Sequence, residues 1–158
     1  MALVIASFCF VILFGAPYLP TLKKQIDLAL DLAEIKPGGV LLELGSGDGR
    51  VLLLAAKRGY RAIGYEINPL LVVISKFITW RYRDLVEIRW GNFLTAKWPA
   101  TGAIFVFGIG RIMPKIDAKI RQAKKPVRLI SFAFPVHGQD PLVVKDGLYV
   151  YSYHRTIA

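Results

Sequence analysis

Short apolar runs alternate with helix-like segments along most of the chain, and this alternation limits the possible folds more than any other feature. Strands that alternate with helices at this spacing favour a mostly parallel sheet with helices on both faces. The predicted strands are 40–44, 62–65, 86–90, 103–107 and 127–132, and the predicted helices are 21–35, with Thr21 as N-cap, 50–58, 70–82 and 113–123.

The C-terminal part of the chain breaks this alternation. Apolar residues at 142–144 and 148–153 flank the pair Asp146-Gly147, which is typical of a two-residue hairpin turn. We therefore predict an α/β, Rossmann-like fold whose mostly parallel sheet ends in a C-terminal antiparallel hairpin. A chain of 158 residues has the size of one domain, which we place at 17–158 after a hydrophobic N-terminal segment.

The N-terminal segment is the most apolar part of the sequence. Residues 2–19 carry no charge, and the first charged side chains are Lys23 and Lys24. Because about 20 apolar residues cross a bilayer, we expect residues 1–16 to anchor the protein in a membrane. The two lysines would then keep the remaining chain in the cytoplasm. A signal peptide is disfavoured because no basic residue precedes the run, and a helix packed on the core or on a partner is the alternative.

Composition excludes several classes of protein. A hydrophobic fraction of 54% excludes a disordered chain. The single cysteine, Cys9, cannot form an internal disulfide, and His137 and His154 show no metal-ligand spacing, so we expect no metal. With 21 Lys and Arg against 11 Asp and Glu, the net charge of +10 favours an anionic neighbour, which is nucleic acid, an acidic protein or an anionic membrane.

The segment 43–50, Glu-Leu-Gly-Ser-Gly-Asp-Gly-Arg, carries the strongest chemical signal. Its glycines let the backbone turn tightly and approach a ligand at the carboxyl edge of the sheet, where open parallel sheets bind their ligands. Glu66 ends the second predicted strand, where a carboxylate can accept hydrogen bonds from both hydroxyls of a ribose. Together these features predict an adenosine-containing cofactor.

The details favour S-adenosylmethionine over a dinucleotide. The glycines follow the pattern Gly-x-Gly-x-Gly, whereas dinucleotide sites place a pyrophosphate on Gly-x-Gly-x-x-Gly. Glu43 stands directly before them, where a carboxylate repels a pyrophosphate and attracts the ammonium group of S-adenosylmethionine. A dinucleotide, or a structural turn without a ligand, is the alternative.

These motifs resemble those of the class I, seven-strand methyltransferases. The chain is most similar to the small protein-lysine methyltransferases related to those that modify the ATP synthase c-subunit and the adenine nucleotide translocase, and to their archaeal relatives. The resemblance covers roughly residues 18–153. It is carried by Tyr18-Leu19-Pro20-Thr21, by 43–50, by Gly64-Tyr65-Glu66-Ile67-Asn68, by Gly91-Asn92-Phe93 and by Phe107-Gly108.

The resemblance implies an enzyme that transfers methyl groups from S-adenosylmethionine to the ε-amine of lysine in a protein substrate, which includes the case of an integral membrane protein. In a eukaryote it implies the mitochondrial inner membrane. The residues it implies for cofactor binding are Tyr18, Glu43, Gly45, Ser46, Gly47, Asp48, Gly49, Glu66, Ile67, Asn68, Asn92 and Phe93.

The candidates for the pocket around the substrate lysine are aromatic or apolar, namely Tyr18, Phe107, Phe134 and Pro135, with Phe132 beside them. An apolar mouth disfavours the ammonium form and so lowers the pKa of a lysine amine, which makes the amine nucleophilic. No residue stands out as a general base, so the catalytic residues are left unassigned.

On the substrate side the chain departs from the family pattern, because Ile109-Gly110 replaces Val-Pro and Ala133 stands where a polar or basic residue is common. Two other functions are open: methylation of nucleic acid, RNA above all, and cofactor binding without catalysis. Nucleic acid is disfavoured as a substrate because residues 107–110, Phe-Gly-Ile-Gly, lack the Asn/Asp-Pro-Pro-Tyr/Phe motif that grips a base amine.

Overall fold

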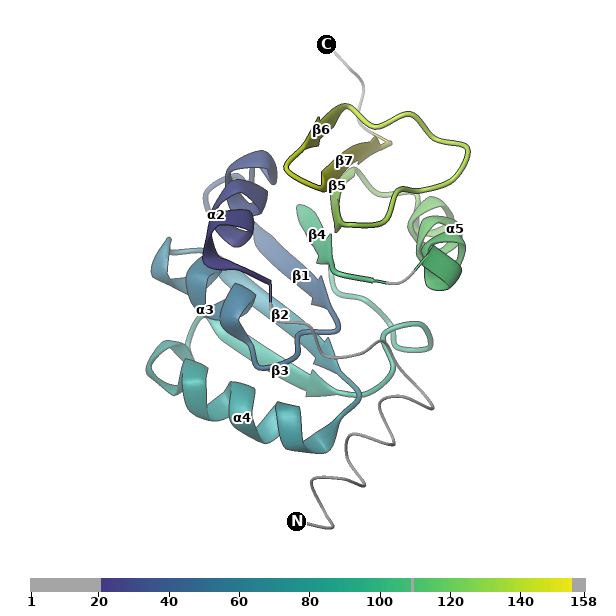
Figure 1. Cartoon of the computed structure of the whole chain (residues 1–158). Coiled ribbons are helices and arrows are strands. Elements are labelled where there is room, and N and C mark those ends of the chain that lie inside the picture. The colour runs from purple at the N-terminus through teal and green to yellow at the C-terminus, as the bar shows by residue number, and fades with distance from the viewer. Residues whose placement is uncertain (1–20, 109, 155–158) are drawn as a thin grey trace.

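A seven-stranded sheet forms the centre of the molecule (Figure 1). The computed structural model describes residues 21–108 and 110–154. The strands are β1 (Val40–Leu44), β2 (Arg61–Glu66), β3 (Val86–Trp90), β4 (Ala103–Val106), β5 (Val127–Phe132), β6 (Val143–Lys145) and β7 (Leu148–Tyr153). The helices are α2 (Lys23–Leu32), α3 (Arg50–Lys57), α4 (Pro69–Thr79) and α5 (Met113–Ala123), with short 3-10 turns η1 (Trp80–Tyr82) and η2 (Gly110–Ile112).

The strand order is β3-β2-β1-β4-β5-β7-β6, and the first five strands in this order are parallel. β7 runs antiparallel to both β5 and β6 and so forms the predicted C-terminal hairpin. Its turn has φ of 47° at Asp146 and 79° at Gly147, the left-handed values that a type I′ turn requires. The predicted fold class is therefore confirmed.

Helices cover both faces of the sheet. α2, α3 and α4 lie on one side and α5 lies on the other, as Figure 1 shows. Because successive strand residues point to opposite faces, Leu41 joins the apolar cluster of α2 and α3, and Leu42 and Leu44 join the cluster of α5. The sheet is thus buried on both faces, and its carboxyl edge is left to the connecting loops.

The first helix differs from its prediction at both ends. It begins at Lys23 with Leu22 at the N-cap position, so the prediction that Thr21 caps it is wrong. Thr21 stands one residue too early for this role, and its side chain is buried. The helix ends at Leu32, before the predicted Ile35, because Glu34 adopts a left-handed φ of 46°.

The predicted membrane anchor, residues 1–16, lies outside the described residues, and so does Tyr18. Within 21–108 and 110–154, no helix has the length and hydropathy of a membrane span.

Candidate active site at the carboxyl edge of the sheet

Three loops that the sequence analysis singled out meet at the carboxyl edge of the sheet. They follow the parallel strands β1, β2 and β3, which are neighbours in the sheet. The amides of Gly45 and Ser46 both donate to the Tyr65 carbonyl at 2.9 Å, which ties the first loop to β2. The Gly91 amide donates to the Glu66 carbonyl at 2.9 Å, which ties the third loop to the same strand. The predicted cofactor residues of these loops therefore lie on one edge.

The glycine turn uses backbone conformations that other residues avoid. The φ angles are 82° at Gly45, 54° at Gly47 and 82° at Gly49, all in the left-handed region. Gly49 has a second constraint, because a Cβ there would lie 2.8 Å from the Ser75 Cβ of α4. The third glycine therefore lets the start of α3 approach α4 closely.

Gly64 in the middle of β2 is a site residue whose role the sequence analysis missed. A Cβ at this position would lie 2.7 Å from the Ser46 Cβ and 2.6 Å from the Leu52 Cδ1. The missing side chain thus makes room for the glycine turn to pack onto β2. The available signal was a glycine inside an otherwise apolar strand, which often marks a close approach of another backbone.

Glu66 joins the loops after β1 and β2. Its Oε2 accepts a hydrogen bond from the Gly47 amide at 2.8 Å, and its Oε1 accepts one from the Asn68 amide at 2.8 Å. Hydrogen bonds from amides to a carboxylate are among the stronger ones in proteins. The side chain is buried, so the predicted ribose ligand is also a structural clamp in this protein.

Glu43 is the most unusual ionisable group of the site. It lies within β1, is only 4% exposed, and its Oε2 has no hydrogen-bond partner among the described residues. Burial first, and then the charges of Asp48 and Glu66, raise the pKa of Glu43 well above its usual value. A buried carboxylate oxygen without a donor is a position where a cationic ligand group would be stabilised.

Several other predicted residues have local structural partners. Asp48 forms an ion pair with Arg50, whose Nη2 lies 2.6 Å from Oδ2. The Asn68 side chain caps α4 by accepting from the Leu70 amide at 3.0 Å, and the Ile67 carbonyl accepts from the Trp90 indole at 3.0 Å. In the described part of the chain, no three His, Cys, Asp or Glu side chains gather as a metal site would require.

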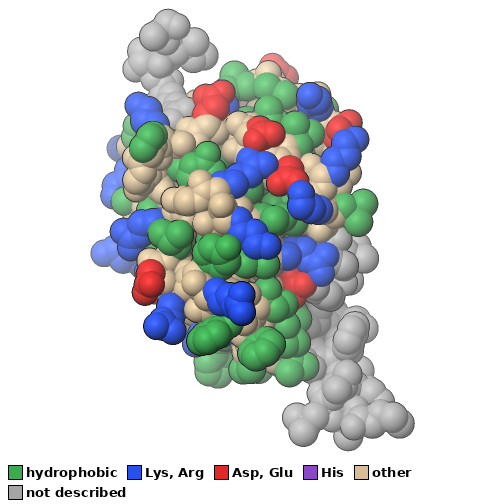
Figure 2. All heavy atoms as spheres, turned by 90° about the vertical axis from the view of Figure 1, so that its left-hand side faces the viewer, with side chains coloured by type: hydrophobic (Ala, Val, Ile, Leu, Met, Phe, Trp, Pro, Cys, Tyr) green, Lys and Arg blue, Asp and Glu red, His purple; other side chains and the backbone are tan. Residues whose placement is uncertain are grey.

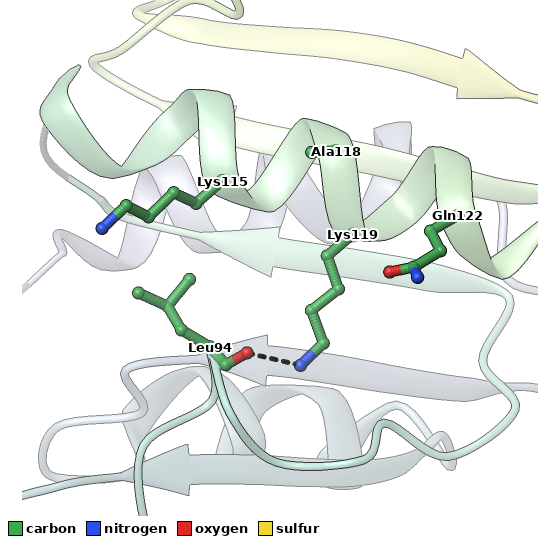
Figure 3. A pocket seen from close by; sticks show the side chains of 5 residues that line it. All are labelled: Leu94, Lys115, Ala118, Lys119 and Gln122. Carbon is green, nitrogen blue, oxygen red and sulfur yellow. Dashed lines mark hydrogen bonds between the residues drawn. The ribbon is translucent and has the colours of Figure 1, made fainter.

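The loop after β3 is held by a lysine that the sequence analysis did not assign to it. Lys119 of α5 donates to the carbonyls of Phe93 at 3.1 Å, Leu94 at 2.8 Å and Ala96 at 2.6 Å. Its Nζ also lies 4.8 Å from the centre of the Trp98 ring. Figure 3 shows Lys119 reaching from α5 to the carbonyl of Leu94. Both residues line an open pocket of about 550 Å³. Lys119 therefore holds the loop that starts with Asn92 and Phe93.

The candidates for the substrate pocket fall into two groups. Phe107 packs on Phe132 with ring centres 4.8 Å apart, on the face of α2 and α3. Phe134 packs on the face of α5, and a Cβ at Gly110 would lie 3.7 Å from its ring. Pro135 is exposed. The loops after β4 and β5 thus bring aromatic rings to the same edge as the glycine turn, although not as one cluster.

A family model matches the chain over the residues that build this edge. Residues 43–143 match the model described as the ANTKMT methyltransferase domain, from Glu43 in β1 to Val143 in β6. The chain belongs to this family. The resemblance inferred from the sequence is therefore confirmed, and the glycine turn, the Glu66 clamp and the loop after β3 all lie within the matched range.

Relatives of this methyltransferase domain are named as lysine methyltransferases. The ATP synthase c-subunit lysine N-methyltransferase of Homo sapiens is 32% identical over 138 residues, which are 84% of this chain and 58% of that protein. The adenine nucleotide translocase lysine N-methyltransferase of Mus musculus is 31% identical over 147 residues, 87% of this chain and 63% of that protein. A protein-lysine N-methyltransferase of Saccharolobus islandicus is 28% identical over 158 residues, 88% of this chain and 96% of that protein.

The chain thus spans about half the length, 49% to 58%, of the vertebrate methyltransferases for the ATP synthase c-subunit that it matches. Among solved structures, an RNA methyltransferase from Salinibacter ruber in complex with S-adenosyl-L-homocysteine matches with a TM-score of 0.81 and 28% identity. The match covers 89% of this chain and 97% of that one, so the two domains share nearly their whole architecture.

Proposed function

We propose that this methyltransferase domain transfers methyl groups from S-adenosylmethionine to the ε-amine of lysine in a protein substrate. The cofactor is S-adenosylmethionine, in agreement with the family of the domain and with the product form bound in the Salinibacter ruber relative. The choice of lysine is supported by the relatives from Homo sapiens, Mus musculus and Saccharolobus islandicus, all of which are named lysine methyltransferases.

The structural observation that carries the cofactor assignment within this proposal is the unpartnered carboxyl group of Glu43. Among the described residues its Oε2 is buried without a donor directly before the glycine turn, in a position that suits the ammonium group of the cofactor and not a pyrophosphate. Two more carboxylates, Asp48 and Glu66, lie near enough to raise the pKa of Glu43, which gives this edge a negative character. S-adenosylmethionine supplies an electrophilic methyl group on a sulfonium, which also carries positive charge.

The ribose is assigned to Glu66. Each of its carboxylate oxygens accepts one backbone amide, and each keeps a further lone pair for a ribose hydroxyl. Gly45, Ser46, Gly47 and Gly49 are also assigned to the cofactor. Gly45 and Gly47 are accessible in the turn, and Ser46 and Gly49 are buried beside them. The remaining assigned cofactor residues are Glu43, Asp48, Ile67, Asn68, Asn92, Phe93 and Tyr18, of which Tyr18 lies outside the described residues.

We assign the aromatic residues after β4 and β5 as the pocket that holds the amine of the substrate lysine. A lysine amine has a reference pKa of about 10.4, so it is mostly protonated at neutral pH and a poor nucleophile. Phe107 and Phe134 are both half-buried and pack on opposite faces of the sheet, and each offers an apolar surface at this edge that disfavours the ammonium form. Their faces also attract a cation before it loses its proton. Pro135 and Tyr18 complete the proposed pocket, and its reaction needs positioning and exclusion of water more than a general base.

We further propose that the protein substrate is a membrane protein and that residues 1–16 anchor the enzyme beside it. The proposal is supported by the uncharged segment 2–19 and by the net charge of +10 of the chain. The catalytic domain then lies on the cytoplasmic side, because Lys23 and Lys24 follow the apolar segment. A flotation assay with and without residues 1–16 tests the anchor, and a wholly soluble full-length protein contradicts it.

RNA methylation is the second candidate, because the Salinibacter ruber relative is titled an RNA methyltransferase and the chain is strongly basic. The residues after β4 disfavour RNA methylation. Phe107-Gly108-Ile109-Gly110 contains no side-chain amide or carboxylate that could hydrogen-bond a base amine.

One assay separates these functions. The protein is incubated with S-adenosylmethionine labelled in its methyl group and with membrane-protein, soluble-protein and RNA fractions of cells that lack it. We expect label in membrane protein, located on lysine by mass spectrometry. Label in RNA alone contradicts the proposal, and tight cofactor binding without any transfer supports a non-catalytic role.

The matched variants for this assay are Glu66→Gln and Glu87→Gln. Glu66→Gln replaces one of the two carboxylate oxygens, each of which accepts a hydrogen bond from a backbone amide, by an NH2 group that can only donate. Cofactor binding and methyl transfer should therefore fall at least tenfold, the equivalent of about 1.5 kcal/mol. Among the described residues the ion pair of Glu87 is with Arg89 on β3, away from the glycine turn, so Glu87→Gln should bind the cofactor normally. Equal binding by both variants in calorimetry would remove Glu66 from the site.

A further inference from the structure

Helix α4 turns its apolar side chains away from the protein. Its buried residues are Val72, Ser75 and Thr79, two of which are polar. Apart from Lys76, its exposed side chains are apolar, with Phe77 78% exposed and Val73 64% exposed. We call the α4 face the set of exposed apolar residues Leu70, Val73, Ile74, Phe77, Ile78, Trp80 and Trp90. A helix that covers a sheet ordinarily buries its apolar stripe, so this arrangement is the reverse of the usual one.

The inward residues are small for a packing reason. Ser75 faces the glycine turn, where a Cβ added to Gly49 would lie 2.8 Å from the Cβ of Ser75. Thr79 satisfies its hydroxyl by donating to the Ser75 carbonyl at 2.7 Å. The site therefore explains what α4 buries, but nothing in the described part of the domain explains the large apolar residues on its outer side.

Two tryptophans mark the ends of the α4 face. Trp90 is 70% exposed, and its indole donates to the Ile67 carbonyl at 3.0 Å, which holds the ring beside the start of α4. Trp80 directly follows the last residue of the helix and is 57% exposed. Figure 2 shows hydrophobic side chains gathered at the lower end of the face that carries α4, with Lys and Arg side chains among them. Exposed tryptophans beside an apolar surface are typical of proteins that contact a lipid interface.

The segment that contains α4 carries only positive charge up to Arg83, and an exposed acid, Asp84, follows it. Residues 67–83 contain Lys76, Arg81 and Arg83 and no acidic residue. All three are exposed, and within the described part of the chain none of them takes part in an ion pair. Several arginines elsewhere in the described chain pair with acids, as Arg58 does with Asp31 at 2.6 Å, although Arg61 and Arg111 do not. The cations around α4 are thus available for an anionic surface.

We propose that the α4 face binds the surface of an anionic lipid bilayer, with α4 lying in the plane of the membrane. The apolar side chains then enter the boundary between headgroups and acyl chains, and Lys76, Arg81 and Arg83 meet the headgroups.

The proposal goes beyond the proposed methyl transfer and does not depend on residues 1–16. It also orients the catalytic edge. α4 starts at Pro69, directly after Asn68 and the Glu66 clamp, so the cofactor edge lies at one end of the membrane-binding helix. Lysines close to the surface of the bilayer would then be the ones within reach of the site.

The test uses the full-length chain with Cys9→Ser and one new cysteine that carries an environment-sensitive fluorophore. Phe77→Cys places the fluorophore on the α4 face, and Gln122→Cys places it on α5, across the sheet, as the matched control. Vesicles contain phosphatidylcholine and phosphatidylglycerol in roughly a three-to-one ratio, with pure phosphatidylcholine as the neutral comparison. A quencher in the acyl chains reports depth. No cofactor or substrate is added, so failure here leaves the proposed methyl transfer untouched.

We expect the emission at position 77 to shift to shorter wavelength and to be quenched on anionic vesicles, with less change on neutral ones and none at position 122. Unchanged emission at 77 while the protein floats with the vesicles overturns the proposal. If the emission at position 77 shifts with protein concentration in the absence of lipid, a second copy of the chain covers the α4 face. If the emission is at short wavelength without lipid at every protein concentration, another part of the same chain covers it. Either result also overturns the proposal. Circular dichroism shows whether both labelled variants are folded.

Discussion

The buried carboxylate of Glu43 should make the stability of the cofactor-free protein depend on pH in an unusual direction. Its Oε2 has no partner among the described residues, and its pKa is raised well above the ordinary value of 4.5. Above pH 4.5 the unfolded chain loses this proton, whereas the folded protein retains it up to the raised pKa. In that window the folded state binds one proton more, so the stability from Glu43 falls as pH rises.

The size of the effect follows from the single proton. One group that is protonated only in the folded state lowers the free energy of unfolding by at most about 1.4 kcal/mol for each pH unit. Glu43→Gln keeps the shape of the side chain and removes the titration. The difference between the wild-type protein and the variant should therefore decline with that slope above pH 4.5, and the variant should be the more stable protein at neutral pH.

The assay is urea unfolding followed by circular dichroism at a series of pH values, without cofactor. Glu87→Gln is the control, because its hydrogen bond with Arg89 lowers the pKa of Glu87. The stability that Glu87 contributes is present above its ordinary pKa and is lost as pH falls, which is the opposite sign. Parallel stability curves for the wild-type protein and Glu43→Gln refute the reasoning.

The cofactor provides a second measurement on the same group. If its ammonium lies beside Glu43, binding favours the carboxylate and releases a proton within the same pH window. Calorimetry in buffers of different ionisation enthalpy should detect this proton with the wild-type protein and not with Glu43→Gln. Proton release that is equal for the two proteins would show that the cationic end binds elsewhere.

Two further variants test contacts that position the site. Gly64→Ala should lower the free energy of unfolding by about 1–3 kcal/mol and weaken cofactor binding, because the new Cβ would lie 2.7 Å from the Ser46 Cβ. A Cβ at Gly102 would meet nothing within 4 Å, so Gly102→Ala should change neither quantity in the same urea and calorimetry assays. Lys119→Met should speed amide hydrogen exchange at Thr95 and Ala96, because three carbonyls of their loop lose a donor worth about 2 kcal/mol. Lys115→Met should leave this exchange unchanged. Equal exchange in the two variants would show that the loop is ordered without Lys119.

Much of the site followed from local sequence because parallel strands bring their carboxyl ends to one edge. A glycine turn after one strand and an acid after the next had to meet there, and the Gly47–Glu66 hydrogen bond of 2.8 Å is the result. The role of Glu66 as a clamp did not follow, because a sequence shows that an acid ends a strand but not which amides face it. The prediction of Thr21 as the N-cap was wrong because the helix starts at Lys23, which moves the N-cap position by one residue to Leu22.

The sequence alone determined the order of strands and helices, the closing hairpin and the position of the glycine turn, since each depends on periodicity or turn chemistry within a few residues. The tertiary structure decided what those elements meet. Gly64 makes room for Ser46, Lys119 reaches across to the loop after β3, and α4 buries Ser75 while it exposes Phe77. Periodicity shows that a helix has an apolar face, but only packing decides whether that face meets the sheet or is turned to the surroundings.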